Sequence, residues 1–317
     1  MTTSEAVSKV FRTRGPSPRP GATGTRAVDL ALIAVAVAWG SSYLAAKEVA
    51  TPDTVLGFLS VRFAVAVAAL ALFIGPRLRA TTRTELCCGG GFGLVLAAIF
   101  ALETFGVTMT SASNAGLIIS LTIVLTPILE NTLRRAGLPA HFYGASALAV
   151  AGVVLLTQSG GFTIPNTGDT LILLAALARA VHVTAIAHFS EGHELDSGRM
   201  TLIQLTTVFL VFTCLAPIFG QSPTRIAAEF SLADWTLTIY LSLACTVFAF
   251  LTQMWAVRRT SPARVSLLLG TEPLWAAAIG ISLAGDPVTA VSLCGAALVL
   301  IGTYWGRSID NQRQATT

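Results

Sequence analysis

Charged side chains within long apolar segments are the feature of this sequence most able to do chemistry. Glu103, Arg179 and Glu272 each lie inside an apolar run. A charged side chain at the centre of a bilayer costs roughly 2.5–3.5 kcal/mol on insertion scales, so it is kept where it is paired, lines water or has a function. Each is therefore a candidate for binding a substrate or carrying a proton. The alternative is that each only holds two helices together.

Arg179 and His182 are three residues apart, so a helix would place them on one face. Arg179 could bind a carboxylate or phosphate group of a substrate, or it could pair with Glu103 or Glu272. Histidine is the side chain whose unperturbed pKa lies in the physiological range, so His182 could carry a proton. The structural alternatives are an internal ion pair for Arg179 and a hydrogen-bonded packing histidine for His182.

Trp39 and Ser42 lie in the second half of the first apolar segment. Facing a cavity, they would offer stacking and hydrogen bonding. The alternative is that Trp39 packs on a neighbouring helix, while Gly40 and the serines permit close helix contact. Arg62, in the second segment, is predicted to be structural, either snorkelling to the surface or pairing with Glu48 or Asp53.

The elements that must position these side chains are predicted to be membrane-spanning helices. The chain has 317 residues, of which 54% are hydrophobic and 11% are charged; soluble domains carry about 25% charged residues. The apolar segments reach roughly 20 residues, which is the length that crosses a bilayer as a helix. Ten spans are predicted, at residues 29–49, 54–75, 86–107, 112–132, 141–158, 169–188, 199–219, 235–256, 263–284 and 289–306.

The two halves of the chain are similar at a shift of 150 residues. The shift places Thr110-Ser111 on Thr260-Ser261 and Gly152 on Gly302. It also places Glu103 on Gln253, which makes Gln253 a further candidate for lining a cavity. With five spans in each half, the second half enters the membrane inverted, as in many secondary transporters.

Prolines in the related spans four and nine predict that both helices are kinked. Pro127 lies within one helical turn of Pro273 after the shift, and Glu272 directly precedes Pro273. A proline leaves a backbone carbonyl without its helical partner, and broken helices mark the binding sites of many transporters.

The distribution of lysine and arginine predicts that both termini are cytoplasmic. With the N-terminus inside, the cytoplasmic segments hold sixteen of the twenty basic residues and the opposite side holds two, Lys47 and Arg225. This is a strong positive-inside bias. The chain is thus divided into a disordered basic tail (1–28), two five-helix repeats (29–158 and 168–306) and a cytoplasmic tail (307–317).

Four motifs resemble the drug/metabolite transporter superfamily, in its form with two EamA domains. They are Trp39-Gly40-Ser41-Ser42-Tyr43, Arg62-Phe63 after Pro52, Thr110-Ser111-Ala112-Ser113-Asn114-Ala115, and Thr271-Glu272-Pro273-Leu274. The resemblance implies ten helices, alternating access, and a central cavity lined mainly by helices 1, 3, 4, 6, 8 and 9. Asn114, at the entry to the fourth span, is a further candidate for lining that cavity.

The predicted function is secondary transport, with export as the expected direction, of a small metabolite such as an amino acid or drug-like compound across the plasma membrane. Coupling to protons or exchange is expected, because the sequence has no ATP-binding loop of the GxxxxGK[ST] type. No enzyme motif, cofactor, metal site or nucleic-acid interaction is predicted, and the protein is expected to be a monomer or homodimer. The alternatives are an intramembrane lipid-modifying enzyme and a membrane receptor or scaffold.

Overall fold

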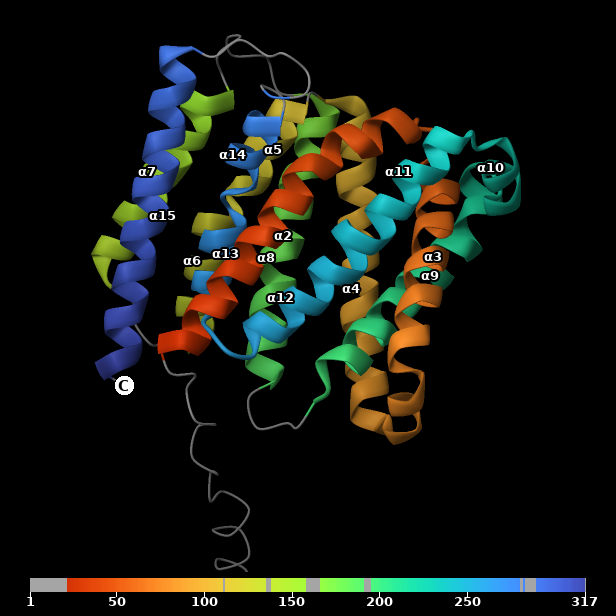
Figure 1. The fold of residues 1–317 in the computed structure, drawn as a ribbon, viewed down its shortest axis with the longest axis horizontal. Helices are drawn as coiled ribbons and strands as arrows, with labels where there is room; N and C mark the ends of the chain where they lie inside the picture. Colours follow the sequence, from red (N-terminus) through yellow and green to blue (C-terminus); the bar gives the residue numbers. More distant parts are fainter. Residues whose placement is uncertain are drawn as a thin grey trace, which may run out of the picture.

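The computed structural model describes residues 22–110, 112–134, 138–157, 166–190, 195–279, 282 and 289–316, and it is a bundle of helices (Figure 1). This described part of the chain contains no strand. Residues 1–21 of the predicted N-terminal tail lie outside the described residues. The first helix begins at Ala22, ahead of the predicted start at residue 29, and the last helix continues to Thr316, through the predicted C-terminal tail.

The helices follow the two halves of the sequence. The first half forms α2 (Ala22–Val49), α3 (Val55–Ile74), the short turn η1 (Gly75–Ala80), α4 (Arg83–Met109), α5 (Ala112–Ser120), α6 (Thr122–Arg134) and α7 (Ala140–Thr157). The second half forms α8 (Thr167–Ser190), α9 (Ser197–Phe219), α10 (Pro223–Glu229), α11 (Leu232–Ser242), the π-helical turn η2 (Leu243–Phe248), α12 (Ala249–Val257), α13 (Pro262–Leu269), α14 (Glu272–Ile279) and α15 (Ala290–Thr316).

Within the described residues, seven helices are long and apolar enough to cross a membrane, and they correspond to predicted spans one, two, three, six, seven, eight and ten. Two further apolar helices, Ile118–Leu133 and Ala140–Leu155, are shorter. The ninth predicted span is divided into α13 and α14. The chain is therefore an all-helical, multi-pass membrane protein, and the number of ten spans stays a prediction.

Helix breaks occur at equivalent positions in the two halves. The first break, at Leu121, separates α5 from α6, and the second, at Gly270 and Thr271, separates α13 from α14. Leu121 N–H donates to the Ile118 carbonyl at 3.1 Å, and Thr271 N–H donates to the Leu268 carbonyl at 3.2 Å. The 150-residue shift places Ile118 on Leu268 and Leu121 on Thr271, so the same tight turn occurs in both halves.

The breaks precede the prolines that were predicted to cause them. Pro127 lies inside α6, and Pro273 lies in the first turn of α14. A proline in the first turn of a helix is compatible with helical structure, because the N–H that it lacks would have no partner there. Both predicted spans are interrupted, but in the first half the interruption lies at Leu121, ahead of Pro127. Kinks at the prolines, at related depth in the membrane, stay a prediction.

Glycines let α7 and α15 pack closely, and the contacts are reciprocal. A Cβ atom on Gly152 would lie 2.6 Å from Val299 N, and a Cβ atom on Gly302 would lie 2.6 Å from Ala149 N. Ala149 and Val299, like Gly152 and Gly302, are related by the 150-residue shift. The contacts run antiparallel, as expected of inverted repeats related by a twofold axis.

Buried polar contacts join the two halves at each end of the bundle. At one end, here called the termini end, Arg264 donates to both carboxylate oxygens of Asp29 at 2.9 and 2.8 Å, and Arg307 Nη1 lies 3.3 Å from Asp29 Oδ2. At the other end, here called the distal end, the Thr110 hydroxyl donates to the Asp169 carboxylate. Each contact links a residue of the first half to one of the second.

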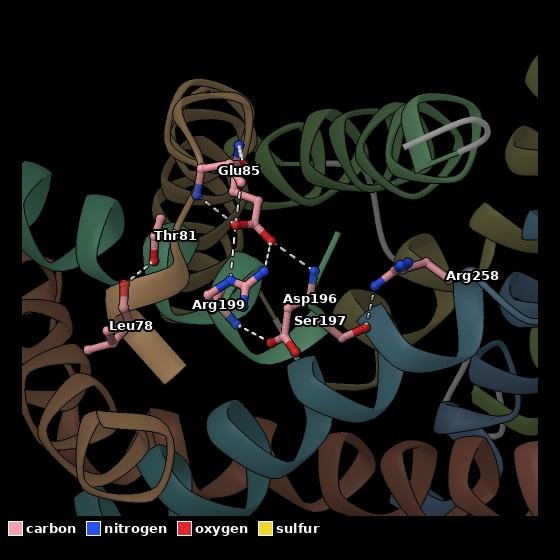
Figure 2. A network of polar contacts seen from close by, with 8 residues as sticks. Leu78, Thr81, Glu85, Asp196, Ser197, Arg199 and Arg258 are labelled. Carbon is pink, nitrogen blue, oxygen red and sulfur yellow. Dashed lines mark hydrogen bonds and ion pairs between the residues drawn. The ribbon is translucent and has the colours of Figure 1, made fainter. Parts of the chain in front are cut away.

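A second network at the termini end connects the starts of α4 and α9 to the turn after α12 (Figure 2). Arg199 donates from Nη2 and Nε to the two Glu85 carboxylate oxygens at 2.7 and 3.0 Å. The Asp196 N–H donates to the same carboxylate at 2.9 Å, and Arg258 donates to the Ser197 hydroxyl at 3.0 Å. Glu85 also completes a capping box with Thr82 at the start of α4.

Replacing Arg199 with alanine should strongly destabilise this end of the protein. Glu85 has 0% exposed side-chain surface, so the substitution leaves a buried carboxylate without its cation. Removing one partner of a buried ion pair typically costs about 3–5 kcal/mol. We expect a clearly lower thermal unfolding midpoint for Arg199→Ala than for the natural protein, measured on the purified protein in detergent micelles.

The matched control for this substitution is Arg225→Ala. Arg225 forms an ion pair with Glu229 at 2.8 Å, close to the 2.7 Å of Arg199 with Glu85, but its side chain is 67% exposed. Water and ions screen such exposed pairs, so their loss hardly affects stability. Equal midpoints for Arg199→Ala and Arg225→Ala would contradict the structural role of the buried network.

Candidate functional site

An ion-pair cluster forms where three helices meet in the interior. Arg179 of α8 places Nη2 at 2.7 Å from Glu103 Oε2 on α4 and Nη1 at 3.5 Å from Glu272 Oε2 on α14. All three side chains are largely buried, Glu272 most deeply with 3% exposed. Both of the pairings considered for Arg179 in the sequence are thus present at once, and one guanidinium is shared by two carboxylates.

The break before α14 positions Glu272. This residue occupies the first turn of α14, where backbone N–H groups lack helical acceptors and a negative charge is favoured. The helix approaches α2 at Gly40, where a Cβ atom would lie 2.7 Å from the Glu272 carbonyl oxygen and 2.9 Å from Ala276 N. Glycine at this position therefore lets α14 come close enough to bring Glu272 to Arg179.

Trp39 covers the cluster from α2. The guanidinium carbon of Arg179 lies 4.7 Å from the centre of the Trp39 ring, in cation–π geometry. The indole Nε1 donates to the Cys245 carbonyl at 2.8 Å. Cys245 belongs to the π-helical turn η2, and such turns occur frequently at functional sites because they redirect backbone groups. Trp39 is thus held by a feature that local sequence patterns do not reveal.

A cavity lies beside the cluster toward the distal end, with about 420 Å³ of space between atoms, open solvent included. Its polar lining includes Ser42, Arg62, Glu103 and Arg179, and its aromatic lining includes Trp39, Tyr43, Phe100 and Phe250. Ser42 donates its hydroxyl to the Trp39 carbonyl at 2.8 Å. The lining residues of α2 and α4 come shortly before the ends of these helices, Val49 and Met109, which lie at the distal end. The cavity therefore lies toward that end.

Two further cavities lie toward the termini end. One, of about 340 Å³, is built around both helix breaks and is lined by Ser120, Thr122, Thr126, Arg179, Val183, Gln253, Ser266, Gly270 and Glu272, among others. The other, of about 300 Å³, includes His182, Thr201, Gln204 and Gln253 in its lining. Arg179 lines both the distal cavity and the cavity at the breaks, so its side chain borders both spaces.

His182 lies on the same helix face as Arg179 but outside its ion-pair cluster. Its Nε2 atom is 2.9 Å from Gln204 Oε1 on α9, and its ring packs edge-on against Phe92. His182 and Gln204 both line the 300 Å³ cavity. The structure shows the hydrogen-bonded, buried histidine of the structural alternative, and the same side chain lines a cavity. Proton carriage by His182 stays a prediction.

The residues paired by the repeat, Glu103 and Gln253, face different cavities. Glu103 lines the distal cavity, whereas Gln253 lines both cavities toward the termini end. Arg179 forms an ion pair with Glu103 and shares the lining of the 340 Å³ cavity with Gln253. This is the arrangement expected when inverted repeats place equivalent residues on opposite sides of the membrane midplane. The position of Asn114 is described only as part of α5, because its side chain lies outside the described residues.

The predicted structural role of Arg62 needs correction. Its side chain is buried, and Nε and Nη2 donate to the Thr246 hydroxyl at 3.2 and 3.0 Å instead of reaching the surface or pairing with Asp53. Thr246 belongs to η2, in the second half of the chain. A signal was present in the sequence, since Arg62 lies two turns inside an apolar segment, too deep for simple snorkelling.

Glu130 joins the two halves near the termini end. Its Oε2 atom accepts a hydrogen bond from the Ala263 N–H at 3.0 Å, at the start of α13. The i,i+4 spacing also predicts a pair with Arg134, whose side chain lies outside the described residues. Throughout the described residues, no group of three or more His, Cys, Asp or Glu side chains could hold a metal ion.

A multi-pass helical bundle with polar cavities on both sides of a buried ion-pair cluster is typical of membrane transporters. The EamA-like transporter family matches this chain twice, at residues 26–158 and 166–305. The protein therefore belongs to the EamA-like transporter family, within the drug/metabolite transporters, and the resemblance found in its motifs is confirmed.

Similar proteins are named as transporters. An uncharacterized transporter of Archaeoglobus fulgidus is 27% identical over 89% of this chain and 86% of its own length. A probable terminal-alkyne amino-acid exporter of Streptantibioticus cattleyicolor is 26% identical over 90% of this chain and 96% of its own. A solved structure described only as a crystal structure of a protein has a TM-score of 0.72 at 16% identity, covering 90% of this chain and 98% of that one, which shows the shared fold.

Proposed function

We propose that this protein is a secondary transporter that exports a small metabolite, such as an amino acid or a drug-like compound, across the plasma membrane. The observation that carries the proposal is the position of Arg179, which lines one cavity toward the distal end and another toward the termini end. A substrate passing between these cavities would have to pass the cluster of Arg179, Glu103 and Glu272.

Alternating access fits this arrangement. Contacts between the halves lie at both ends of the bundle, Asp29 with Arg264 at the termini end and Thr110 with Asp169 at the distal end. In the proposed cycle these contacts open in turn while the two inverted five-helix repeats rock about the central cluster. The reciprocal glycine contacts of α7 and α15 support the inverted relation of the repeats.

The driving force is proposed to be a proton gradient or exchange with a second solute. Glu103 and Glu272 share a single buried cation, so one of them can take up a proton without leaving Arg179 unpaired. The bias of basic residues supports an orientation in which the termini end faces the cytoplasm. The name of the Streptantibioticus cattleyicolor relative, a probable amino-acid exporter, supports amino acids as the first compounds to test.

A counterflow assay tests the proposal. The purified full chain is placed in liposomes preloaded with one compound of a panel of amino acids and other small metabolites, and entry of the labelled compound is followed. We expect accumulation above that in protein-free liposomes for at least one compound, without ATP. Failure to move any compound of a broad panel, with protein shown to be folded by its thermal unfolding transition, would contradict transport.

A further inference from the structure

Arg62 is a buried cation that the ion-pair cluster does not use. Its side chain is 5% exposed, in the middle of α3, and it lines the 420 Å³ distal cavity together with Trp39 and Glu103. The guanidinium carbon lies 5.2 Å from the centre of the Phe100 ring and 5.9 Å from that of Phe63. These aromatic faces stabilise a cation, but they do not neutralise its charge.

The partner that Arg62 does have is neutral. Both of its described hydrogen bonds go to the Thr246 hydroxyl, which in turn donates to the Leu241 carbonyl at 2.8 Å. Among the residues that the structure describes, no carboxylate lies within ion-pair distance of Arg62. The other well-buried arginines differ, since Arg179, Arg199 and Arg264 each bind a carboxylate at 2.7 or 2.8 Å.

The hydrogen bonds to Thr246 leave one edge of the guanidinium free. They use Nε and Nη2, and no acceptor for Nη1 is found in the described part of the chain. Nη1 and the second N–H of Nη2 can therefore donate two parallel hydrogen bonds to a carboxylate, in the paired geometry that arginine prefers. Thr246 fixes the orientation of the fork, because η2 turns its hydroxyl toward α3.

We propose that Arg62 is the anion-binding residue of the distal cavity and that the transported compounds carry a carboxylate, which Arg62 binds. Arg179, already shared by Glu103 and Glu272, is not the group that binds it. The aromatic rings of Trp39, Phe100 and Phe250 line the same cavity and suit an apolar body attached to that carboxylate. This inference rests on the proposed transport function.

Matched acids and amides test the preference for a carboxylate on the unaltered protein. Leucine, methionine and tryptophan are each compared with the corresponding amide as ligands of the purified full chain, by the shift of its thermal unfolding midpoint with ligand concentration. The acids should half-saturate the shift at concentrations at least tenfold lower than their amides. Absence of binding by every acid, or equal binding of acid and amide, overturns the proposal.

Substitution of Arg62 tests the residue itself. Arg62→Met should raise the half-saturating concentration of the acids at least tenfold and leave that of the amides unchanged. Arg62→Lys, which keeps the charge but loses the fork, should have a smaller effect in the same direction and serves if Arg62→Met does not fold. The matched control is Arg259→Met, which removes an exposed arginine from the Trp255 ring, 4.7 Å away, outside the cavity.

The same preparations separate this inference from the proposed function. Counterflow of any compound by the natural protein, together with unchanged acid binding in Arg62→Met and Arg62→Lys, would overturn the role of Arg62 while transport stands. Absence of counterflow for every compound contradicts transport itself. Loss of acid counterflow in Arg62→Met, with amide binding retained, supports both.

Discussion

Replacing Arg179 with alanine should reduce transport by at least a hundredfold. The substitution leaves Glu103 and Glu272 close to each other in the protein interior without the cation that now lies 2.7 Å and 3.5 Å from them. Their mutual repulsion and the loss of the Trp39 cation–π contact would displace the lining of two cavities. Initial rates of counterflow in liposomes, for the compound that the natural protein moves best, measure the effect.

A neutral triple variant separates function from structural support. In Arg179→Met with Glu103→Gln and Glu272→Gln, all three charges are removed while the side chains keep similar lengths. Removing one partner of a buried ionic cluster is costly because it leaves a charge unpaired, whereas replacing the whole cluster by uncharged side chains of similar volume leaves no such charge. We therefore expect this variant to unfold near the temperature of the natural protein and still to transport poorly.

The two variants together give a clear decision. If the cluster only supports the fold, the triple variant regains transport along with stability. If the charges take part in transport, stability returns without activity. Recovery of the natural transport rate in the triple variant would therefore contradict the proposed role of Arg179, Glu103 and Glu272.

Replacing Gly40 with alanine should have the second largest effect. The added Cβ atom would lie 2.7 Å from the Glu272 carbonyl oxygen and 2.9 Å from Ala276 N, both rigid backbone atoms. Overpacking of this kind typically costs about 1–3 kcal/mol. Because α14 must move away from α2, Glu272 would shift relative to Arg179, and a displacement of about 1 Å at a functional site can lower a rate roughly a hundredfold. Thermal unfolding and counterflow rates measure the two consequences.

Gly91→Ala provides the matched control in another helix. A Cβ atom on Gly91 of α4 would meet nothing within 4 Å. Alanine is favoured over glycine within helices by roughly 0.5–1 kcal/mol, so this variant should be as stable as the natural protein or slightly more so. A Gly40→Ala protein that transports as well as Gly91→Ala would show that α2 and α14 do not need the close approach seen here.

Local features of the sequence were enough to predict the helical membrane fold and most of the central residues. The apolar segments predict long helices because only a helix satisfies its own backbone hydrogen bonds within lipid. Glu103, Arg179 and Glu272 were recognised because each charge inside such a segment carries a cost that something must offset. The repeat at 150 residues also predicted that interruptions in the fourth and ninth spans would be related.

The sequence did not predict which way Arg62 faces, where one helix is interrupted, or that a π-helical turn is present. Arg62 was expected near the surface or beside Asp53, yet it bonds Thr246 in the other half of the chain. The break expected near Pro127 occurs at Leu121, where no proline marks it. The π-helical turn η2, which presents Cys245 to Trp39 and Thr246 to Arg62, has no recognisable local signal.

The sequence by itself determined that this protein spans a membrane, contains two related halves and keeps charges within its helices. Only the tertiary structure decided that Arg179 is neutralised by two glutamates while Arg62 is not. The physical reason is that a helix surrounded by lipid and other helices is apolar on every face, so its pattern does not reveal its rotation. Which charges meet is then set by contacts between helices far apart in the sequence, made possible by Gly40 and the breaks at Leu121 and Thr271.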